Sequence, residues 1–515
     1  MHPTRISEAR SDQHLPAHSQ ISDHSVKLGD AKPALLFAVT VAIRNPAQLR
    51  DNKSIEVPFR TQKALLQKKR LHNQVLDFYV TLVTESQMKR RHFLSTLGST
   101  FGAFGTPYSL RGQTPPSSPA RTDNYADVLA VEPGDADAYF TEEKLKAAID
   151  IDMSLDNNKF EVVAYNYPGW HSTPFMNKAF ENGWTEFEVL RNSKPLYPGH
   201  LFPKYPLWGY FNEAQAEGSE HEIETASEFG IDVWMIDWYW FNGTMLFHEQ
   251  LENGFLKARN RSRLKFAIMW ADDDWTNLFP ARSPSDAAIL LKQKTDKDDM
   301  LRLADYCIEH YFHQPNYWRI EGRPVFGIFN LNLLLRYLAA DQLKQVFETM
   351  RERVARAGLG DLHLQASHQG GYAGHEGKLK TLGFDSATYY HTFGYTYSGT
   401  HPPGSRIPYG QAALETIRLW KETAAKVSVP FFPDCPVGWD DSARYGRNAV
   451  MVTQRSPDQY QRLLRAAQYF SAGNSNGPKI IFLSSWNEWT EDHVLLPDTV
   501  FGYSYLDAVR RTFRS

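Results

Sequence analysis

The sequence lacks the features that mark several common protein classes. Among its 515 residues are only two cysteines, Cys307 and Cys435, which lie far apart and show no metal-ligand spacing. They indicate neither a zinc site nor a disulfide framework, although a single bridge between them stays open. No run approaches about 18 consecutive apolar residues, so we expect no membrane-spanning helix. The formal net charge of -3 argues against a dedicated nucleic-acid-binding protein.

What the chain does contain is material for a large core, with 42% hydrophobic and 13% aromatic residues. From residue 160 onward, short apolar runs alternate with amphipathic stretches, and we interpret the runs as β-strands. The eight expected strands are 160–167, 231–238, 264–271, 323–330, 362–368, 384–391, 429–436 and 479–486. Helices are expected between them at 221–229, 298–313, 341–357, 411–426 and 457–471.

This alternation predicts an α/β protein whose residues 159–515 form a (β/α)8 barrel, the TIM barrel. Such a barrel typically takes about 250 residues and can exceed about 400 with insertions. The alternative is an open doubly wound sheet, which usually has a glycine-rich turn after its first strand, whereas this chain has PGWHSTPF. A barrel further predicts that all eight strands end at one face, where the active site lies.

Aromatic and acidic residues recur at the end of nearly every expected strand. Rings stack on the apolar faces of sugars, while carboxylates and amides bind sugar hydroxyl groups, so this recurrence indicates a carbohydrate site. The candidate substrate-binding residues at these ends are Asp237, Trp238, Tyr239, Trp240, Asn242, Trp270, Asp272, Asp274, Trp275, His368, Tyr390, Asp434 and Trp439. The adjacent acids at 272–274 could also hold a structural calcium ion, and no other cofactor is expected.

The connection between the first two strands, about sixty residues long, exceeds an ordinary loop. Its many aromatic residues, set among prolines and glycines, predict an irregular lobe that covers the barrel mouth. Within this long aromatic-rich loop, Trp184 and Glu186 are the expected substrate contacts.

The last expected strand runs directly into the hexapeptide WNEWTE at residues 486–491. On a first helical turn, Glu488 and Glu491 would point to the same side. Two such carboxyl groups can divide acid and base duties at a glycosidic bond, so we consider both catalytic. Trp486, Asn487 and Trp489 are further candidate contacts to the sugar.

The N-terminal part has a different character. The segment MKRRHFLSTLGSTFGAFG, which begins at Met88, has the arginine pair and the weakly apolar run of a twin-arginine export signal. Because such a signal is read at an N-terminus, we expect 1–87 to be a non-native, disordered extension and 88–112 the signal peptide. A genuine extension with a short basic helix is the alternative. We expect 113–158 to be a linker and lead-in, and the protein to be periplasmic or secreted.

Several long motifs resemble those of a known family. They are GWTEFE, SKPLYPGHLFPKYPLWGYF, EFGIDVWMIDWYWFNG, FAIMWADDDWT and SSWNEWTE. Through them, most of residues 160–510 resembles the WbsX-type proteins, also called glycoside-hydrolase-99-like. The resemblance implies a (β/α)8 barrel that acts either in polysaccharide synthesis or in glycan hydrolysis.

The related endo-alpha-mannosidases carry a NEWxE motif, which residues 487–491 match. The resemblance implies that Glu491 protonates the leaving oxygen and later activates water. Glu488 would act as a base on the sugar 2-hydroxyl, so that configuration is retained through a 1,2-anhydro sugar. The chain departs from the pattern at 492–494, where DHV replaces Gly-Thr-Gln, and at WADDDW, where relatives usually have WANENW. The resemblance therefore does not extend to mannose specificity.

Three functions follow as hypotheses. A retaining glycoside hydrolase is favoured by the export signal, because nucleotide sugars are not available outside the cytoplasm. A glycosyltransferase of polysaccharide synthesis and a non-catalytic glycan-binding barrel are the alternatives. If the hydrolase used ordinary double displacement, it would need a second carboxylate about 5 to 5.5 Å from the acid, which Asp237, Asp272 or Asp274 could supply.

Overall fold

The computed structural model describes residues 140–149, 155, 159–279, 287–368, 372, 374–397, 400–473 and 477–514. The expected extension, signal peptide and most of the linker lie outside these residues. Cys307 and Cys435 are both buried and free, so no bridge joins them. None of the helices in the described ranges has the length and apolarity needed to cross a bilayer.

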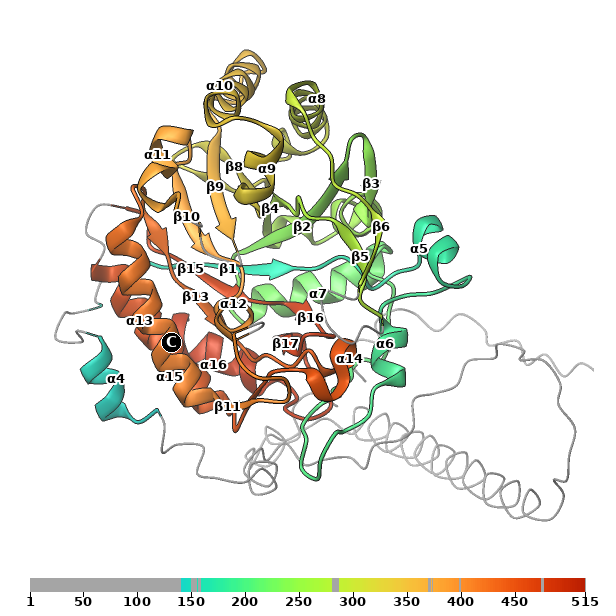
Figure 1. The fold of residues 1–515 in the computed structure, drawn as a ribbon, viewed down its shortest axis with the longest axis vertical. Helices are drawn as coiled ribbons and strands as arrows, with labels where there is room; N and C mark the ends of the chain where they lie inside the picture. Colours follow the sequence, from blue (N-terminus) through green and yellow to red (C-terminus); the bar gives the residue numbers. More distant parts are fainter. Residues whose placement is uncertain are drawn as a thin grey trace, which may run out of the picture. The chain divides into compact units, whose positions relative to one another are not determined.

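The described residues form a (β/α)8 barrel, as predicted (Figure 1). Its parallel strands follow one another around the sheet in the order β12, β10, β9, β8, β4, β2, β1, β15, β13. Their bounds are β1 (Glu161–Asn166), β2 (Val233–Phe241), β4 (Lys265–Trp270), β8 (Arg323–Ile328), β9 (His363–His368), β10 (Ser386–Tyr389), β12 (Phe431–Phe432), β13 (Asp434–Pro436) and β15 (Ile480–Ser484).

The seventh expected strand is divided, and this division closes the ring. β12 pairs with β10, whereas β13 pairs with β15 on the other side. Pro433 lies between the two halves and has no N–H to donate to a ladder, although its carbonyl oxygen accepts from Phe482 N at 2.9 Å. The segment that contains β12 and β13 therefore pairs first with β10 and then with β15.

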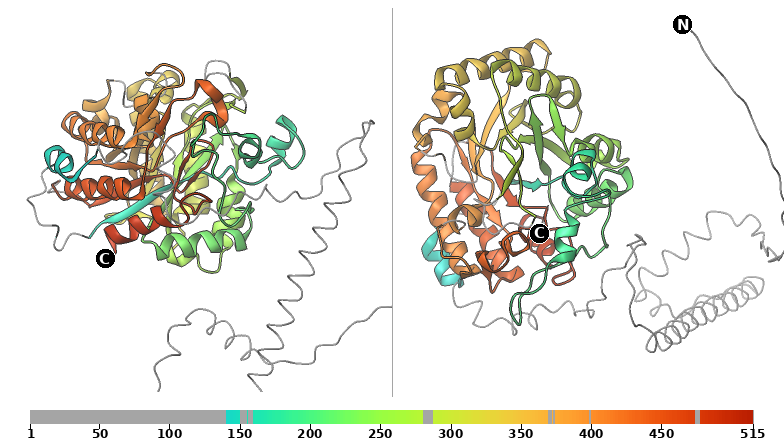
Figure 2. Two further views of the ribbon diagram at one scale, coloured as in Figure 1. Left: turned by 90° about the horizontal axis from the view of Figure 1, so that it is seen from below. Right: turned by 45° about the vertical axis from the view of Figure 1, so that its right-hand side comes forward.

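Helices surround the strands in the views of Figures 1 and 2, and each buries an apolar face on them. In α10 (Ala340–Arg356), the buried Leu343, Val346, Phe347, Met350 and Val354 recur at helical spacing, which is the pattern of a helix packed on one side. The other outer helices are α7 (Ala216–Glu228), α8 (Lys297–Cys307), α11 (Leu379–Leu382), α13 (Tyr409–Lys426), α15 (Pro457–Gly473) and α16 (Ser504–Phe513).

The crossover from β2 to β4 departs from the regular alternation. It contains a π-helical turn, Gln250–Gly254, and two 3-10 turns, Phe255–Lys257 and Arg261–Arg263, in place of an α-helix. A Cβ at Gly254 would lie 2.1 Å from the carbonyl oxygen of Glu213, so the backbone here packs directly against the segment before α7. This close approach favours glycine at the position.

Further short strands and helices lie at the two ends of the barrel. The strands are β3 (Thr244–Leu246), β5 (Trp275–Asn277), β6 (Ala288–Leu291), β7 (Arg319–Ile320), β11 (Arg406–Pro408), β14 (Met451–Thr453), β16 (Asn487–Glu488) and β17 (His493–Val494). The helices are α4 (Glu142–Ala148), α5 (Pro174–Ala179), α6 (Phe187–Asn192), α9 (Leu331–Tyr337), α12 (Thr392–Tyr397) and α14 (Ser442–Tyr445). The long loop after β1 carries α5 and α6.

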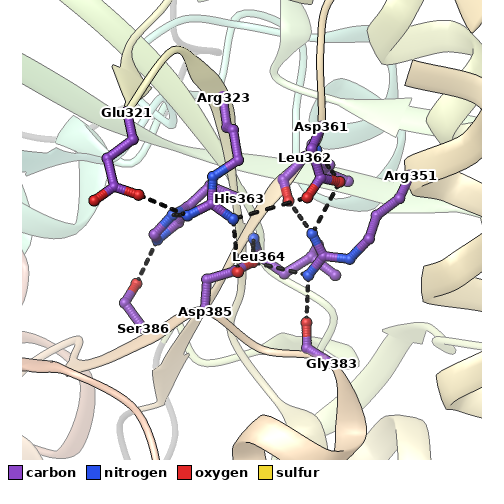
Figure 3. Close-up of polar contacts among 10 residues, drawn as sticks. All are labelled: Glu321, Arg323, Arg351, Asp361, Leu362, His363, Leu364, Gly383, Asp385 and Ser386. Atoms are coloured by element: carbon purple, nitrogen blue, oxygen red, sulfur yellow. Dashed lines mark hydrogen bonds and ion pairs between the residues drawn. The ribbon is translucent and has the colours of Figure 1, made fainter. Parts of the chain in front are cut away.

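At the amino end of the barrel, charged side chains from three neighbouring strand starts form a network (Figure 3). Asp385 accepts from Arg323 Nη1 at 2.7 Å, from Arg351 Nη2 at 2.8 Å and from Leu364 N at 2.9 Å. Asp361 contacts Arg351 as well. We call Arg323, Arg351, Asp361 and Asp385 the amino-end cluster.

Candidate active site

A small cavity of about 160 Å³ opens at the carboxyl end of the barrel strands. Its walls come from the ends of six strands, which confirms the predicted convergence at one face. The lining residues that bear on its chemistry are Tyr167 after β1, Asp237 and Tyr239 in β2, Asp273, Asp274 and Trp275 after β4, Phe329 after β8, Tyr390 after β10, Arg444 in α14, and Glu488 and Glu491 after β15.

Glu488 and Glu491 lie on a β-hairpin and not on the expected helical turn. β16 and β17 pair antiparallel, with Glu488 opposite His493. The amide of Asn487 clamps the hairpin to the end of β1, since it accepts from Tyr167 N and donates to Tyr167 O, both at 2.8 Å. A three-residue spacing therefore places both carboxyl groups in one cavity through a tight turn.

A buried ionic network anchors that turn. Asp492, directly after Glu491, has a positive φ of 61°, which a non-glycine residue rarely adopts. Its backbone oxygen accepts from Arg455 Nη1 at 3.0 Å, and its carboxylate pairs with Arg455 Nη2 and with Lys204 Nζ, the latter at 3.1 Å. These contacts hold the strained residue and, with it, the position of Glu491.

Three glutamates converge on one arginine, and we call Glu186, Glu488, Glu491 and Arg444 the glutamate cluster. Arg444 Nη1 pairs with Glu491, and Arg444 Nη2 lies 3.1 Å from Glu186 Oε1 and 3.9 Å from Glu488 Oε2. His493 Nε2 lies 2.8 Å from the second oxygen of Glu491. Glu491 thus has a partner on each carboxylate oxygen, whereas the buried Glu488 Oε2 has no hydrogen-bond partner among the described residues.

The electrostatics of the two carboxyl groups diverge. Burial and the negative charge of Glu491 raise the pKa of Glu488 well above its ordinary value. Burial alone would also raise the pKa of Glu491, but Arg444 and the hydrogen bond from His493 outweigh it and lower this pKa to about 2. These opposed shifts favour Glu488 over Glu491 as the group that keeps a proton in the free protein. The resemblance implied the opposite order, with the proton on Glu491.

A third carboxyl group, Asp237, faces the same cavity from β2. Its Oδ2 accepts from the hydroxyl of Tyr390 at 2.8 Å, and its Oδ1 is buried and finds no hydrogen-bond partner in the ranges that the structure describes. Burial raises the pKa of Asp237 well above its ordinary value, with a further contribution from the charge of Glu491. An unpartnered buried oxygen in a cavity wall is suited to receive a hydroxyl group of a ligand.

The acids at 272–274 have separate partners. Asp274 binds Lys292 Nζ at 2.5 Å, whereas Asp272 accepts from Asn330 N at 2.6 Å and does not line the cavity. Burial raises the pKa of Asp272 to about 8. Within the described ranges no group of three or more His, Cys, Asp or Glu residues could hold a metal ion. The calcium site considered from the sequence therefore has no ligand set there.

A larger cavity of about 620 Å³ adjoins the small one, and the two share Phe279 and Arg444 as walls. It lies between α6 and α14, which are neighbours in Figure 1. Trp184 lines this larger cavity, together with polar groups from both helices and their flanking turns, among them Asn192, Ser193, Lys194, Ser442 and Asn448.

Comparison with known proteins places the chain in a family. Residues 162–509, more than half of the chain, match the family described as Glycosyltransferase WbsX. The chain belongs to the WbsX family. The resemblance predicted from the sequence is thereby confirmed.

Two curated relatives are the uncharacterised protein WxcX of two strains of Xanthomonas campestris pv. campestris. Each is 24% identical over 367 residues, which cover 68% of this chain and 49% of the relative. The chain thus spans about half the length of these relatives.

Two solved structures are similar to the chain. A family-99 endo-alpha-mannosidase from Bacteroides thetaiotaomicron, in complex with bis-tris propane, is 13% identical with a TM-score of 0.45, and the match covers 70% of this chain and 98% of that one. A glycoside hydrolase-like protein is 16% identical with a TM-score of 0.46, and the match covers 72% and 99%.

In this WbsX-family chain, the site residues expected from the sequence fall into three groups. Glu488, Glu491, Asp237, Tyr239, Asp274, Trp275 and Tyr390 line the small cavity, and Trp184 lines the large one. Glu186 and Asn487 are buried behind the cavity walls, where they bind Arg444 and Tyr167. The structure places the others away from both cavities: Trp238, Trp240, Asn242, Trp270, Asp272, His368, Asp434, Trp439, Trp486 and Trp489.

Most of this last group serves the core. The indole N–H of Trp486 donates to Glu222 at 2.9 Å and that of Trp240 to Asp299 at 2.9 Å, both on the helix side of the strands. Asp434 accepts from Thr392 N at 2.9 Å and is fully buried. Trp439 stacks on His493, the partner of Glu491, so it contacts the site through His493.

Two important residues were not predicted from the sequence. Arg444 sits in the short helix α14, in the loop that follows β13, and its partners Glu186 and Glu491 are distant in sequence. His493 was noted only as a departure from the family motif. Only one local signal could have drawn attention to Arg444: it is a basic residue in the strand-end loop at 437–450.

Proposed function

We propose that the protein is a glycoside hydrolase that cleaves glycosidic bonds in an oligosaccharide or polysaccharide. The observation that carries the proposal is the Glu488 and Glu491 pair, two carboxyl groups that line one small cavity and whose pKa values are shifted in opposite directions. Hydrolysis needs one group that gives a proton to the leaving oxygen and one that takes a proton or stabilises the cation. Carboxyl groups whose surroundings push their pKa values apart meet that need.

The walls of the cavity support a sugar as the ligand. Tyr239, Trp275, Phe329 and Tyr390 supply aromatic surface, and Asp237 supplies an unpartnered acceptor for a hydroxyl group. Rings and hydroxyl acceptors together suit a ring that is apolar on its faces and polar on its rim. The larger cavity gives room for the adjoining sugar units.

The proposed mechanism retains configuration. One carboxyl group protonates the glycosidic oxygen as its bond to the anomeric carbon breaks, while the other, as carboxylate, takes the proton of the 2-hydroxyl group and a 1,2-anhydro sugar forms. Water then opens this ring at the anomeric carbon, and the two carboxyl groups return to their starting states. The family resemblance gives Glu491 the acid role, whereas the opposed pKa shifts favour Glu488 as the protonated group.

The dependence of the cleavage rate on the leaving group decides whether Glu488 or Glu491 is the acid. A variant that lacks the general acid keeps much of its rate on aryl glycosides with a good leaving group, because such a group departs without protonation. If Glu488→Gln is rescued in this way and Glu491→Gln is not, Glu488 is the acid. The reverse result assigns the acid role to Glu491.

The name of the WbsX family supports a second candidate, a glycosyltransferase. This activity would need an activated sugar donor, whereas the glutamate cluster is rich in carboxylates that disfavour a diphosphate nearby. The twin-arginine pattern at Met88 supports export and, with it, hydrolysis outside the cytoplasm. A reporter enzyme fused after residue 112 should be exported when translation starts at Met88, and cytoplasmic retention would contradict this location.

A panel assay tests the proposed reaction. Plant, bacterial and marine polysaccharides are incubated with the protein, and the new reducing ends are measured. In matched reactions that contain a nucleotide sugar, the consumption of that donor is measured as well. The hydrolase gives reducing ends without a donor, whereas donor-dependent elongation would establish the transferase. Binding without turnover on any glycan of the panel would favour the third candidate, a glycan-binding barrel. Proton NMR of the first product reads its anomeric configuration, and inversion would contradict the retaining mechanism.

A further inference from the structure

The glutamate cluster contains an uneven distribution of hydrogen-bond donors. Glu491 has Arg444 on one oxygen and His493 on the other, whereas Glu488 Oε2 lies 3.9 Å from Arg444 Nη2, beyond hydrogen-bond range, and has no hydrogen-bond partner within the described part of the chain. The Arg444 side chain is only 9% exposed, so little water can replace these contacts. A buried carboxylate with two donors keeps its charge, and its undonated neighbour takes the proton.

The position of Arg444 is itself fixed. Its Nη2 also binds Glu186, which in turn accepts from the hydroxyl of Tyr167 at 2.6 Å and from Thr490 in the catalytic hairpin. The guanidinium lies 5.4 Å from the ring centre of Phe279, the other residue shared by the two cavities. Arg444 is therefore held between the carboxyl pair and the wall that a ligand spanning both cavities must touch.

We propose that Arg444 is a positioning residue that keeps Glu491 ionised and so places the shared proton of the pair on Glu488. The catalytic role of this arrangement rests on the proposed function. The effect of Arg444 on which glutamate carries the proton is a property of the free protein and can be tested without activity. Arg444 acts through Glu491 and takes no part in bond making.

Other titratable groups also act on the pair and define what the test must separate. Those facing Glu488 or Glu491 are Tyr167 after β1, Glu186 before α6, Asp237 and Tyr239 in β2, Asp441 and Tyr445 beside Arg444, Tyr390 after β10, and His493 in β17. Beside these groups, Arg444 is the fixed cation. His493 does not share this role, because burial lowers its pKa and keeps its ring neutral at physiological pH. Removing Arg444 therefore removes the largest single contribution that lowers the pKa of Glu491, while the hydrogen bond from His493 remains.

A titration that needs no activity tests the proposal. Infrared spectra of the full chain are recorded against pH, and the Glu491 carboxyl band is identified by its absence in Glu491→Gln. In Arg444→Gln, the pH at which Glu491 takes up its proton should rise by about 1 to 3 units, the usual effect of an opposite charge at this range. An unchanged titration in folded Arg444→Gln overturns the proposal. Arg444→Met gives the same readout if the first variant does not fold.

Two matched variants complete the experiment. Arg444→Lys keeps the charge but not the planar fork, so its shift should be smaller than that of Arg444→Gln. Arg323→Gln, which removes an arginine from the amino-end cluster, should leave the Glu491 titration unchanged, and an equal shift there would overturn the assignment to Arg444. On a cleaved glycan, the acid limb of kcat/KM should move to higher pH in step with the infrared titration. If no glycan is cleaved, the infrared result still stands alone.

Discussion

The two ends of the barrel both gather arginines and carboxylates, but they balance them differently. In the amino-end cluster two arginines face two aspartates, and Asp385 accepts from both arginines and a backbone N–H. At the carboxyl end, one arginine faces three glutamates. Arg351 and Asp385 are each 20% exposed, whereas the Glu488 side chain is only 7% exposed.

The difference shows in the pKa values. Burial would raise the pKa of Asp385, but hydrogen bonds from Arg351, Leu364 and Arg323 lower it, so this carboxylate stays charged in the folded protein. At the other end, the pKa values of Glu488 and Glu491 move in opposite directions. Pairs of carboxyl groups with strongly shifted pKa values are more typical of functional sites than of structural ion pairs. This agrees with the general division of a TIM barrel into a stability face and a catalytic face.

The largest expected effect is on catalysis at the carboxyl end. Glu488→Gln and Glu491→Gln should each lower kcat/KM on the natural bond by about 10²- to 10⁴-fold, because each removes one half of the acid and base pair. The melting temperature of Glu488→Gln should stay close to that of the wild type, because the raised pKa of Glu488 favours its neutral form. That of Glu491→Gln should fall, because the buried Arg444 loses its carboxylate partner. A variant that keeps full activity would break the assignment of function to this end.

The amino end should respond in stability and not in rate. Asp385→Asn leaves Arg323 and Arg351 without their shared carboxylate, and we expect a loss of about 2 kcal/mol in the free energy of unfolding. Denaturant melts measure this loss, and kcat/KM per folded molecule should be unchanged. A fall in kcat/KM without a fall in stability would contradict the comparison.

The large cavity should affect binding of long substrates more than chemistry. Asn192 is exposed on α6 and lines that cavity, so Asn192→Ala removes a hydrogen-bonding group at little cost to the fold. We expect KM for a long glycan to rise by about fivefold, which corresponds to about 1 kcal/mol, with kcat unchanged. A short substrate that fills only the small cavity serves as the control, and an equal rise there would contradict the subsite.

A buried histidine near the carboxyl end should, like the amino-end cluster, act on stability. His171 lies 3.1 Å from Glu213 and 3.4 Å from Glu249. Burial alone would lower the pKa of His171, but these two carboxylates raise it to about 9. Because the folded pKa is above the ordinary 6.5, its stabilisation is complete below about pH 6.5 and is lost as the pH rises through about 9. Melting temperatures across this window should fall in the wild type, and His171→Gln should flatten that slope.

The barrel was predictable from the sequence because its signals are local. Runs such as VWMIDW and IIFLS alternate with helices whose apolar residues recur at helical spacing, and the structure has strands and helices at these places. The division of the seventh strand at Pro433 was not foreseen, since it depends on which neighbours β12 and β13 meet. Closure of the ring is a property of the whole sheet.

The site was only partly predictable because it depends on contacts between distant residues. The spacing of Glu488 and Glu491 is the same in a helical turn and in a hairpin, and the choice is fixed by the clamp between Asn487 and Tyr167. Strand-end tryptophans such as Trp486 look alike in sequence whether they face a ligand or the surrounding helices. The role of Arg444 depends on partners at positions 186 and 491, which no local pattern reveals.

The central claim is that the carboxyl pair of the barrel hydrolyses a glycosidic bond. The most direct measurement is cleavage of a glycan in water enriched in oxygen-18, with mass spectrometry of the products. The account predicts one heavy oxygen at each new reducing end with the wild type and none above background with Glu488→Gln or Glu491→Gln. Products without heavy oxygen, or heavy-oxygen products that persist in both variants, would contradict it.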